Sequence, residues 1–346
     1  MLKIPTSAHG MPDGTRRCPS VGVPRWTPGA LGLAAALLAA CLTAEPPDVV
    51  SQREEKVLNL AFSDHVFADV NVSDGLAAMK VWIETIGRRR HVSVTVQGRV
   101  YDELAVLRQG LHAREIDLAV ISARDYLSLA EEGVLEPQFM SVRAGKATEQ
   151  YVLLARKNGG IGDVSALRDR SVLVQKTSRT NMASLWLETL LMEKGMPANA
   201  AKAKEVNKVT RAALPVFFGQ ADACVVNQNG LETLVELNPQ VGKQLQVLAT
   251  SSEILPIITC LRAGYRPSFL KDFLSAAYEL NQDAAGRQVL AIFQVEGVVS
   301  FDPSYLDAVK DLLKRHHELK QHEVLKAEQA VSAADGKALG ARAEVP

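Results

Sequence analysis

Short apolar runs alternate with amphipathic segments along most of this chain, and this alternation constrains the fold more than any other feature. An apolar run at residues 57–62 precedes a helical pattern at 75–86, and the same order begins again near residue 150. Strands that take turns with helices favour an α/β fold with a largely parallel sheet. We therefore predict two successive α/β units.

The boundaries of the predicted elements follow from these patterns and from turn residues. Gly195 and Pro197, for example, are the kind of residues that end a helix. The predicted strands span residues 57–62, 92–96, 116–121, 150–156, 171–174, 223–226, 245–249 and 257–261. The predicted helices span residues 75–86, 101–109, 125–132, 164–167, 182–194, 214–218, 231–237, 269–280, 286–293 and 305–320.

The order of these elements predicts two lobes. The last helices have no strands of their own, so we expect them to pack back onto the first unit. Two chain segments then cross between the lobes as a hinge, and a cleft between hinged lobes is a common ligand site. Lobe 1 comprises residues 57–146 and 257–322, lobe 2 comprises residues 147–256, and residues 323–346, rich in Ala, Lys, Glu and Gly, form a disordered tail.

The start of the chain has the features of an export signal. A basic segment with Arg16 and Arg17 precedes an apolar run at residues 30–40, which is shorter than the roughly 20 residues that span a bilayer as a helix. Cys41 follows directly after Leu-Ala-Ala, which resembles the bacterial lipoprotein signal. The resemblance implies lipidation of Cys41 and a protein of the periplasm or cell surface that is anchored to a membrane. The alternative is an ordinary secretory signal with a chance cysteine. We expect a signal peptide at residues 1–40 and a tether at residues 41–56.

Composition excludes several classes of protein. The formal net charge is zero, so no basic surface for nucleic acid is predicted. The sequence has no HExxH, GxSxG, Walker or Cys-x-x-Cys motif, and we predict no metal site, cofactor or catalytic centre. Cys224 and Cys260 lie in apolar strand-like runs, where buried free thiols are the usual state. A disulfide between them is the alternative in an oxidising compartment.

Three stretches carry a resemblance to a known family. Tyr101 precedes a helix that ends at Gly110, Asp117 opens an apolar strand, and Tyr126 lies in the next loop. A strand, a short helix and a second strand then lead to a hydroxyl-rich turn that opens a helix, and a Gly-x-Ala-Asp-Ala turn at residues 219–223 precedes another strand. In this order over residues 57–319, the chain is similar to the phosphonate-binding family of ABC-transporter solute receptors.

The resemblance implies a type II periplasmic binding protein, in which two α/β lobes are joined by a two-segment hinge. It implies a monomer that binds a small oxyanion (phosphate, phosphite or phosphonate) in the cleft and docks on an ABC permease in the inner membrane. It does not imply an enzyme. Three alternatives remain: a sensory module for a partner such as a histidine kinase, an enzyme on the same scaffold, and a receptor for an organic anion.

The hydroxyl-rich turn is the main candidate for contact with an anion. A helix N-terminus offers free N–H groups and a partial positive charge, which can hold a phosphate-like group without a metal. A guanidinium in the turn can add a charged bidentate contact. A plain helix cap is the alternative reading, since Ser, Thr and Asn all cap helices well. The residues of the turn are Thr177, Ser178, Arg179, Thr180 and Asn181.

The remaining candidates follow strands, where ligands bind in open α/β sheets. Lobe 1 supplies Ser63, Tyr101, Ser122 and Tyr126, each of which has an alternative reading as an ordinary turn or surface residue. Lobe 2 supplies Asn227, at a position where the family's aminophosphonate-binding members tend to have a carboxylate. This difference argues against a ligand that carries an amine.

Overall fold

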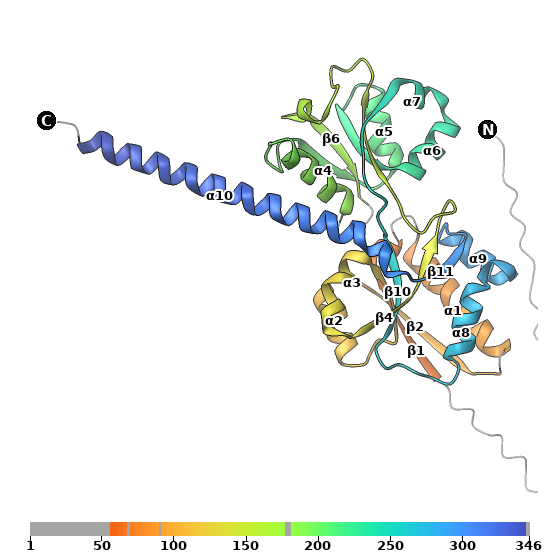
Figure 1. Cartoon of the computed structure of the whole chain (residues 1–346). Helices are drawn as coiled ribbons and strands as arrows, with labels where there is room; N and C mark the ends of the chain where they lie inside the picture. The colour runs from red at the N-terminus through yellow and green to blue at the C-terminus, as the bar shows by residue number, and fades with distance from the viewer. Residues whose placement is uncertain (1–55, 68–69, 90, 177–180, 344–346) are drawn as a thin grey trace, which may run out of the picture. The chain divides into compact units, whose positions relative to one another are not determined.

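The computed structural model describes residues 56–67, 70–89, 91–176 and 181–343 (Figure 1). The predicted signal peptide, nearly all of the tether and Cys41 lie outside these residues, as do Thr177, Ser178, Arg179 and Thr180. Within the described residues, no helix has both the length and the apolar character needed to cross a membrane.

The first of two sheets mixes parallel and antiparallel strands, in the order β11-β4-β10-β3-β1-β2. The strands β1, β2 and β3 are parallel, whereas β10, β4 and β11 are antiparallel to their neighbours. The predicted largely parallel sheet is therefore only half correct, because the chain returns to this sheet in the opposite direction. The strands are β1 (Lys56–Ser63), β2 (Val94–Tyr101), β3 (Leu118–Ser122), β4 (Leu135–Val142), β10 (Ile257–Arg262) and β11 (Gly297–Ser300).

Alternation along these strands divides the core between the two faces of the first sheet. Leu60 and Phe62 join one apolar cluster, whereas Ala61 between them joins another, as expected when successive side chains point to opposite faces. The helices on the Phe62 face are α1 (Val72–Arg89), α8 (Leu270–Tyr278) and α9 (Ala284–Ile292), and those on the Ala61 face are α2 (Leu104–His112) and α3 (Ala123–Leu129). Short 3-10 turns lie at Asp64–Phe67, Ala130–Glu132, Leu280–Gln282 and Pro303–Leu306.

The second sheet has the order β7-β6-β8-β5-β9 and is likewise mixed. Leu154 contributes to the face covered by α5, α6 and α7, and Leu153 to the face covered by α4. The strands are β5 (Tyr151–Arg156), β6 (Ser171–Gln175), β7 (Lys202–Val206), β8 (Ala223–Asn227) and β9 (Leu245–Thr250). The helices are α4 (Met182–Glu193), α5 (Val209–Phe217), α6 (Gln228–Leu237) and α7 (Pro239–Gln244), with a 3-10 turn at Val164–Leu167.

Two chain segments join the sheets, between β4 and β5 and between β9 and β10. They lie antiparallel, and the backbone N–H of Glu149 donates to the carbonyl of Ile254 at 2.8 Å while that of Ile254 donates back at 2.8 Å. Glu253 adds side-chain contacts, since its carboxylate accepts from Lys146 Nζ at 2.6 Å and from Thr148 Oγ1 at 2.7 Å. These bonds tie the two segments into one short ribbon.

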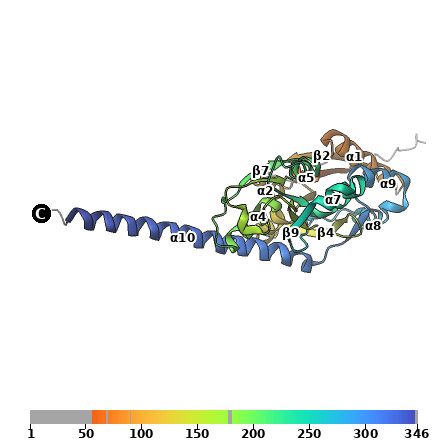
Figure 2. The same cartoon turned by 90° about the horizontal axis from the view of Figure 1, so that it is seen from above.

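The C-terminal helix α10 (Asp307–Ala343) is longer than predicted. Val309 in its first turn belongs to the apolar cluster that includes Ala61 of the first sheet, and the helix also packs against α4, beside the second sheet (Figure 2). Arg315 pairs with Glu193 and His316 with Glu188, each at 2.9 Å. The segment expected to be a disordered tail is helical to Ala343, because Ala, Lys and Glu are strong helix formers and no proline lies between Pro303 and Pro346.

Candidate functional site

The carboxyl ends of β1, β2 and β3 place three candidate residues along one edge of the first sheet. Ser63 pairs with Tyr101 in register, and Ser122 ends the strand on the other side of β1. Ser63 is 5% exposed, and its Oγ is the one buried side-chain polar atom among the described residues that has no hydrogen-bond partner. A buried hydroxyl without a partner is costly, so a ligand that bonds to it would remove that cost.

Tyr101, Ser122 and Tyr126 are engaged within lobe 1. The hydroxyl of Tyr101 lies against α2, within 3.8 Å of the position that a side chain at Gly110 would occupy. Ser122 caps α3, since its Oγ accepts from the backbone N–H of Asp125 at 3.0 Å. Its hydroxyl hydrogen is still able to donate.

Tyr126 is half-buried against Phe301, with ring centroids 6.1 Å apart. Burial raises the pKa of its hydroxyl, and the nearby Cys260 thiol raises it further. Tyr126 is therefore a neutral hydrogen-bonding group at ordinary pH.

Asn227 caps α6 and also bridges to the ribbon between the sheets. Its Oδ1 accepts from the backbone N–H groups of Asn229 and Gly230 at 3.0 and 3.4 Å. Its Nδ2 donates to Glu149 Oε2 at 2.7 Å, and its backbone N–H donates to Gln175 Oε1 at 2.9 Å. The side-chain amide of Asn227 therefore already bonds to the start of α6 and to the ribbon between the sheets.

Glu149 is the polar residue that sequence reasoning missed. Its carboxylate accepts from the Tyr151 hydroxyl on one oxygen and from Asn227 Nδ2 on the other. Glu149 belongs to no motif. The sequence shows only that an acidic residue directly precedes the predicted strand at residues 150–156. A carboxylate therefore lies beside Asn227 after all, although it comes from a different part of the chain.

Asn181 caps α4 and shares the helix start with a second carboxylate. Its Oδ1 accepts from the backbone N–H of Ala183 at 3.2 Å, and its Nδ2 donates to Glu205 Oε1 at 3.0 Å. The same carboxylate accepts from Ser184 Oγ at 3.0 Å and lies 3.4 Å from Lys176 Nζ. Burial works to raise the pKa of Glu205, but the bonds from Asn181 and Ser184, with Lys176, lower it overall. The cap reading thus holds for Asn181.

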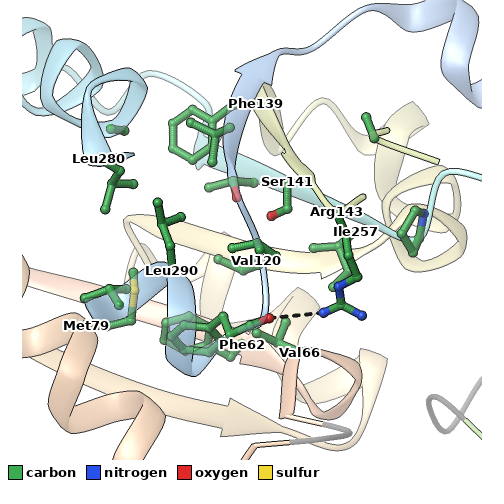
Figure 3. A pocket seen from close by; sticks show the side chains of 18 of the residues that line it. Phe62, Val66, Met79, Val120, Phe139, Ser141, Arg143, Ile257, Leu280 and Leu290 are labelled. Carbon is green, nitrogen blue, oxygen red and sulfur yellow. Dashed lines mark hydrogen bonds between the residues drawn. The ribbon is translucent and has the colours of Figure 1, made fainter. Parts of the chain in front are cut away.

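A cavity of about 160 Å³ lies between the first sheet and its helices α1, α8 and α9 (Figure 3). Phe62, Val120 and Leu290 are among its apolar walls, and Thr148, Glu149 and Asn227 also line it. The cavity therefore joins an apolar interior to the polar residues beside the hinge. Such a combination of apolar walls and a few polar groups is typical of small-molecule sites.

The two cysteines are buried thiols of low reactivity. Cys224 in the second sheet and Cys260 in the first are both buried and free, as predicted. Burial raises the pKa of both thiols, which makes them poor nucleophiles. Among the described residues, no group of three His, Cys, Asp or Glu side chains is arranged to hold a metal ion.

Solved structures share the fold of this chain at low identity. A Xanthomonas citri protein, XAC2383, solved with ATP, is 14% identical, with a TM-score of 0.58 over 77% of this chain and 99% of that one. A binding protein component of an ABC phosphonate transporter from Pseudomonas aeruginosa is 16% identical, with a TM-score of 0.55 over 84% and 100%. PhnD1 from Prochlorococcus marinus, in complex with methylphosphonate, is 14% identical, with a TM-score of 0.54 over 75% and 98%. These likenesses establish the type II fold.

The sequence family rests on a separate comparison. No curated protein matches the chain. A family model described as "ABC transporter, phosphonate, periplasmic substrate-binding protein" matches residues 66–306, which is more than half of the 346 residues. Members of this family bind solutes and are not enzymes. The chain therefore belongs to the family of periplasmic substrate-binding proteins of ABC phosphonate transporters.

Proposed function

We propose that this protein binds a small phosphorus oxyanion (phosphate, phosphite or phosphonate) between its two lobes and delivers it, as a monomer, to an ABC permease in the inner membrane. The family match supports transport. The relative from Pseudomonas aeruginosa is named as a phosphonate-transporter component, and the one from Prochlorococcus marinus was solved with methylphosphonate. Ligand binding would favour the closed arrangement of the lobes, which the permease then recognises.

The observation that carries this proposal is the unpartnered hydroxyl of Ser63. Ser63 lies at the carboxyl end of β1, where open α/β sheets bind ligands. Its hydroxyl can donate to an oxyanion, and a bond to a charged group is stronger than one to a neutral group. Ser122 and Tyr126 follow the neighbouring strand β3 and offer two further hydroxyl donors in the same lobe. Tyr101 ends β2 beside Ser63 and completes the proposed lobe 1 set.

The second lobe would meet the anion at the start of α4. The candidates there are Thr177, Ser178, Arg179 and Thr180, directly before the Asn181 cap. The carboxylate of Glu205 bonds to Asn181 at this helix start, and its negative charge would repel a bound anion. Lys176 offsets that charge in part, since it lies 3.4 Å from the carboxylate. Asn227 would contribute from the neighbouring strand β8.

Calorimetric titration of the purified protein with phosphate, phosphite, methylphosphonate and sulfate tests the ligand class. We expect saturable heat with at least one phosphorus oxyanion and a weaker response to sulfate. A Ser178→Ala, Thr180→Ala double variant should bind that oxyanion more weakly. Absence of binding to every phosphorus oxyanion would refute the proposal.

The proposed anchor rests on Cys41 and can be tested without the ligand. Lipid attached to Cys41 would keep the receptor close to its permease, on a tether that spans residues 41–56. Metabolic labelling with a fatty-acid analogue should mark the wild-type protein and leave a Cys41→Ser variant unmarked. Label on the Cys41→Ser variant would contradict the anchor and leave the ligand proposal intact.

A further inference from the structure

We propose that the apolar cavity of lobe 1 binds a non-polar substituent of the ligand, so that the protein prefers an organophosphonate with a compact apolar group of about six carbons. A phenyl or short alkyl group is the expected substituent. The inference rests on the proposed function, since it places the oxyanion at the hinge. It goes beyond that function in predicting that phosphate, phosphite and methylphosphonate bind measurably but more weakly than a phosphonate with a larger apolar group.

The size of the cavity sets the size of the substituent. Its volume is about 160 Å³, and apolar cavities of about 150 Å³ in proteins are known to stay dry and to bind benzene. The walls come from the sheet and from two of the helices that cover it: Phe62 and Val120 on the sheet, Met79 on α1 and Leu290 on α9 (Figure 3). These side chains offer water no hydrogen bonds, whereas an apolar group would recover the dispersion contacts that an empty cavity lacks.

The position of the cavity links it to the proposed oxyanion site. Asn227 and Glu149, which bond to each other beside the hinge, also line the cavity. A ligand with its apolar group among Phe62 and Leu290 would therefore have its polar end near lobe 2.

A positive charge also lines the cavity. The guanidinium of Arg143 donates to the carbonyls of Phe293 and Gln294 at 3.1 and 3.0 Å. These two carbonyls follow the last turn of α9, so the charge of Arg143 is fixed in place. This fixed cation offers an anionic head group a charged partner and offsets the carboxylate of Glu149, which also lines the cavity.

Titration of the purified protein with methylphosphonate, phenylphosphonate and hexylphosphonate tests the preference. We expect phenylphosphonate or hexylphosphonate to bind at least tenfold more tightly than methylphosphonate, with a more negative heat-capacity change because more apolar surface is buried. Equal affinities would overturn this inference and leave the proposed function standing. Failure of every phosphonate, and of phosphate and phosphite, to bind would instead refute the proposed function.

Benzene tests the cavity independently of any oxyanion. Benzene should raise the thermal midpoint of the wild-type protein, as expected for a ligand that binds only the folded state. Val120→Phe, which fills the cavity from β3, should abolish both the benzene shift and the preference for the phenyl group. Val247→Phe makes the same change at an exposed position of β9 and should retain both.

A smaller substitution guards against a Val120→Phe protein that does not fold. Ala277→Val on α8 adds two methyl groups at the cavity wall and should reduce the benzene shift. A benzene shift that survives in both cavity variants, or that is absent from the wild-type protein, would contradict the assignment of this cavity.

Discussion

The polar groups at the edges of the two sheets differ in whether they have hydrogen-bond partners within the protein. At the edge of the second sheet and in the adjoining ribbon, Glu149, Asn227 and Asn181 bond to other groups of the protein. In the first sheet, the hydroxyl of Ser63 is buried without a partner. Polar groups that bond to one another are already ordered before the ligand binds. A buried polar group without a partner gains a hydrogen bond only when the ligand binds. The comparison indicates that lobe 2 is preorganised and that lobe 1 has more to gain from the ligand.

The apolar cores of the two lobes also differ, since the core of lobe 2 is filled and that of lobe 1 contains a cavity. In the second sheet, Leu153 and Leu154 of β5 are at most 1% exposed, and each packs in its own apolar cluster. Beside the first sheet, Val120 of β3 and Leu290 of α9 border a cavity of about 160 Å³. Side chains next to a cavity already lack some contacts, so their removal costs less than removal from a filled core.

The largest expected effect is a difference in stability between core substitutions in the two lobes. Leu154→Ala should lower the free energy of unfolding by about 2–5 kcal/mol, because it opens a new hole in a filled core. Leu290→Ala should cost less, since it only enlarges an existing cavity. Leu237→Ala at an 81% exposed position is the control and should change stability by less than about 0.5 kcal/mol. Urea unfolding measures all three; equal losses for Leu154→Ala and Leu290→Ala would show that the cores do not differ.

A smaller loss of stability should follow when a hydrogen bond at the edge of lobe 2 is removed. Tyr151→Phe removes the hydroxyl that donates to the Glu149 carboxylate, and the expected loss of stability is about 1–3 kcal/mol. Tyr278→Phe is the matched control, because the Tyr278 hydroxyl meets Ser300 on the exposed side of lobe 1. Thermal unfolding of both variants gives the comparison. A Tyr151→Phe protein as stable as Tyr278→Phe would mean that the bond to Glu149 does not order this edge.

The smallest effect concerns pH. The folded-state pKa of Glu205 is lower than its ordinary value of 4.5, so its contribution to stability is present above that value. The contribution is lost as the pH falls through the lower folded-state pKa. The wild-type protein should therefore lose more stability than Glu205→Gln between about pH 5 and pH 3. Parallel pH profiles for the two proteins would contradict the role given to Asn181, Ser184 and Lys176.

Sequence reasoning succeeded where an element is buried on both faces. The strands β5 and β8 are nearly continuous apolar runs, β1 is interrupted by Asn59, and the positions of all three were predicted to within a residue or two. It missed β7, whose Lys-Ala-Lys-Glu-Val sequence resembles a loop, because this strand lies at the edge of the sheet, where charged side chains are common. It also missed β4, which contains Pro137.

For the candidate site, the sequence allowed some residues to be named, but not their hydrogen bonds or the cavity beside them. Ser63 and Asn227 could be named because polar residues directly after strands mark the ligand edge of an α/β sheet. Their bonding could not be predicted. The contact of Glu149 with Asn227 joins residues 78 positions apart, and it depends on how the hinge ribbon meets the second sheet. The cavity depends on packing among three helices and a sheet, which the apolar pattern alone does not specify.

The affinity of Ser63→Ala for methylphosphonate, relative to that of the wild-type protein, tests the central claim most directly. If the buried hydroxyl serves the ligand, the variant should bind at least tenfold more weakly, because it loses a bond to a charged group worth about 1.5–3 kcal/mol. Its thermal midpoint without ligand should be unchanged or higher, since a buried unpartnered hydroxyl is removed. Equal affinity of the variant and the wild-type protein would contradict the account.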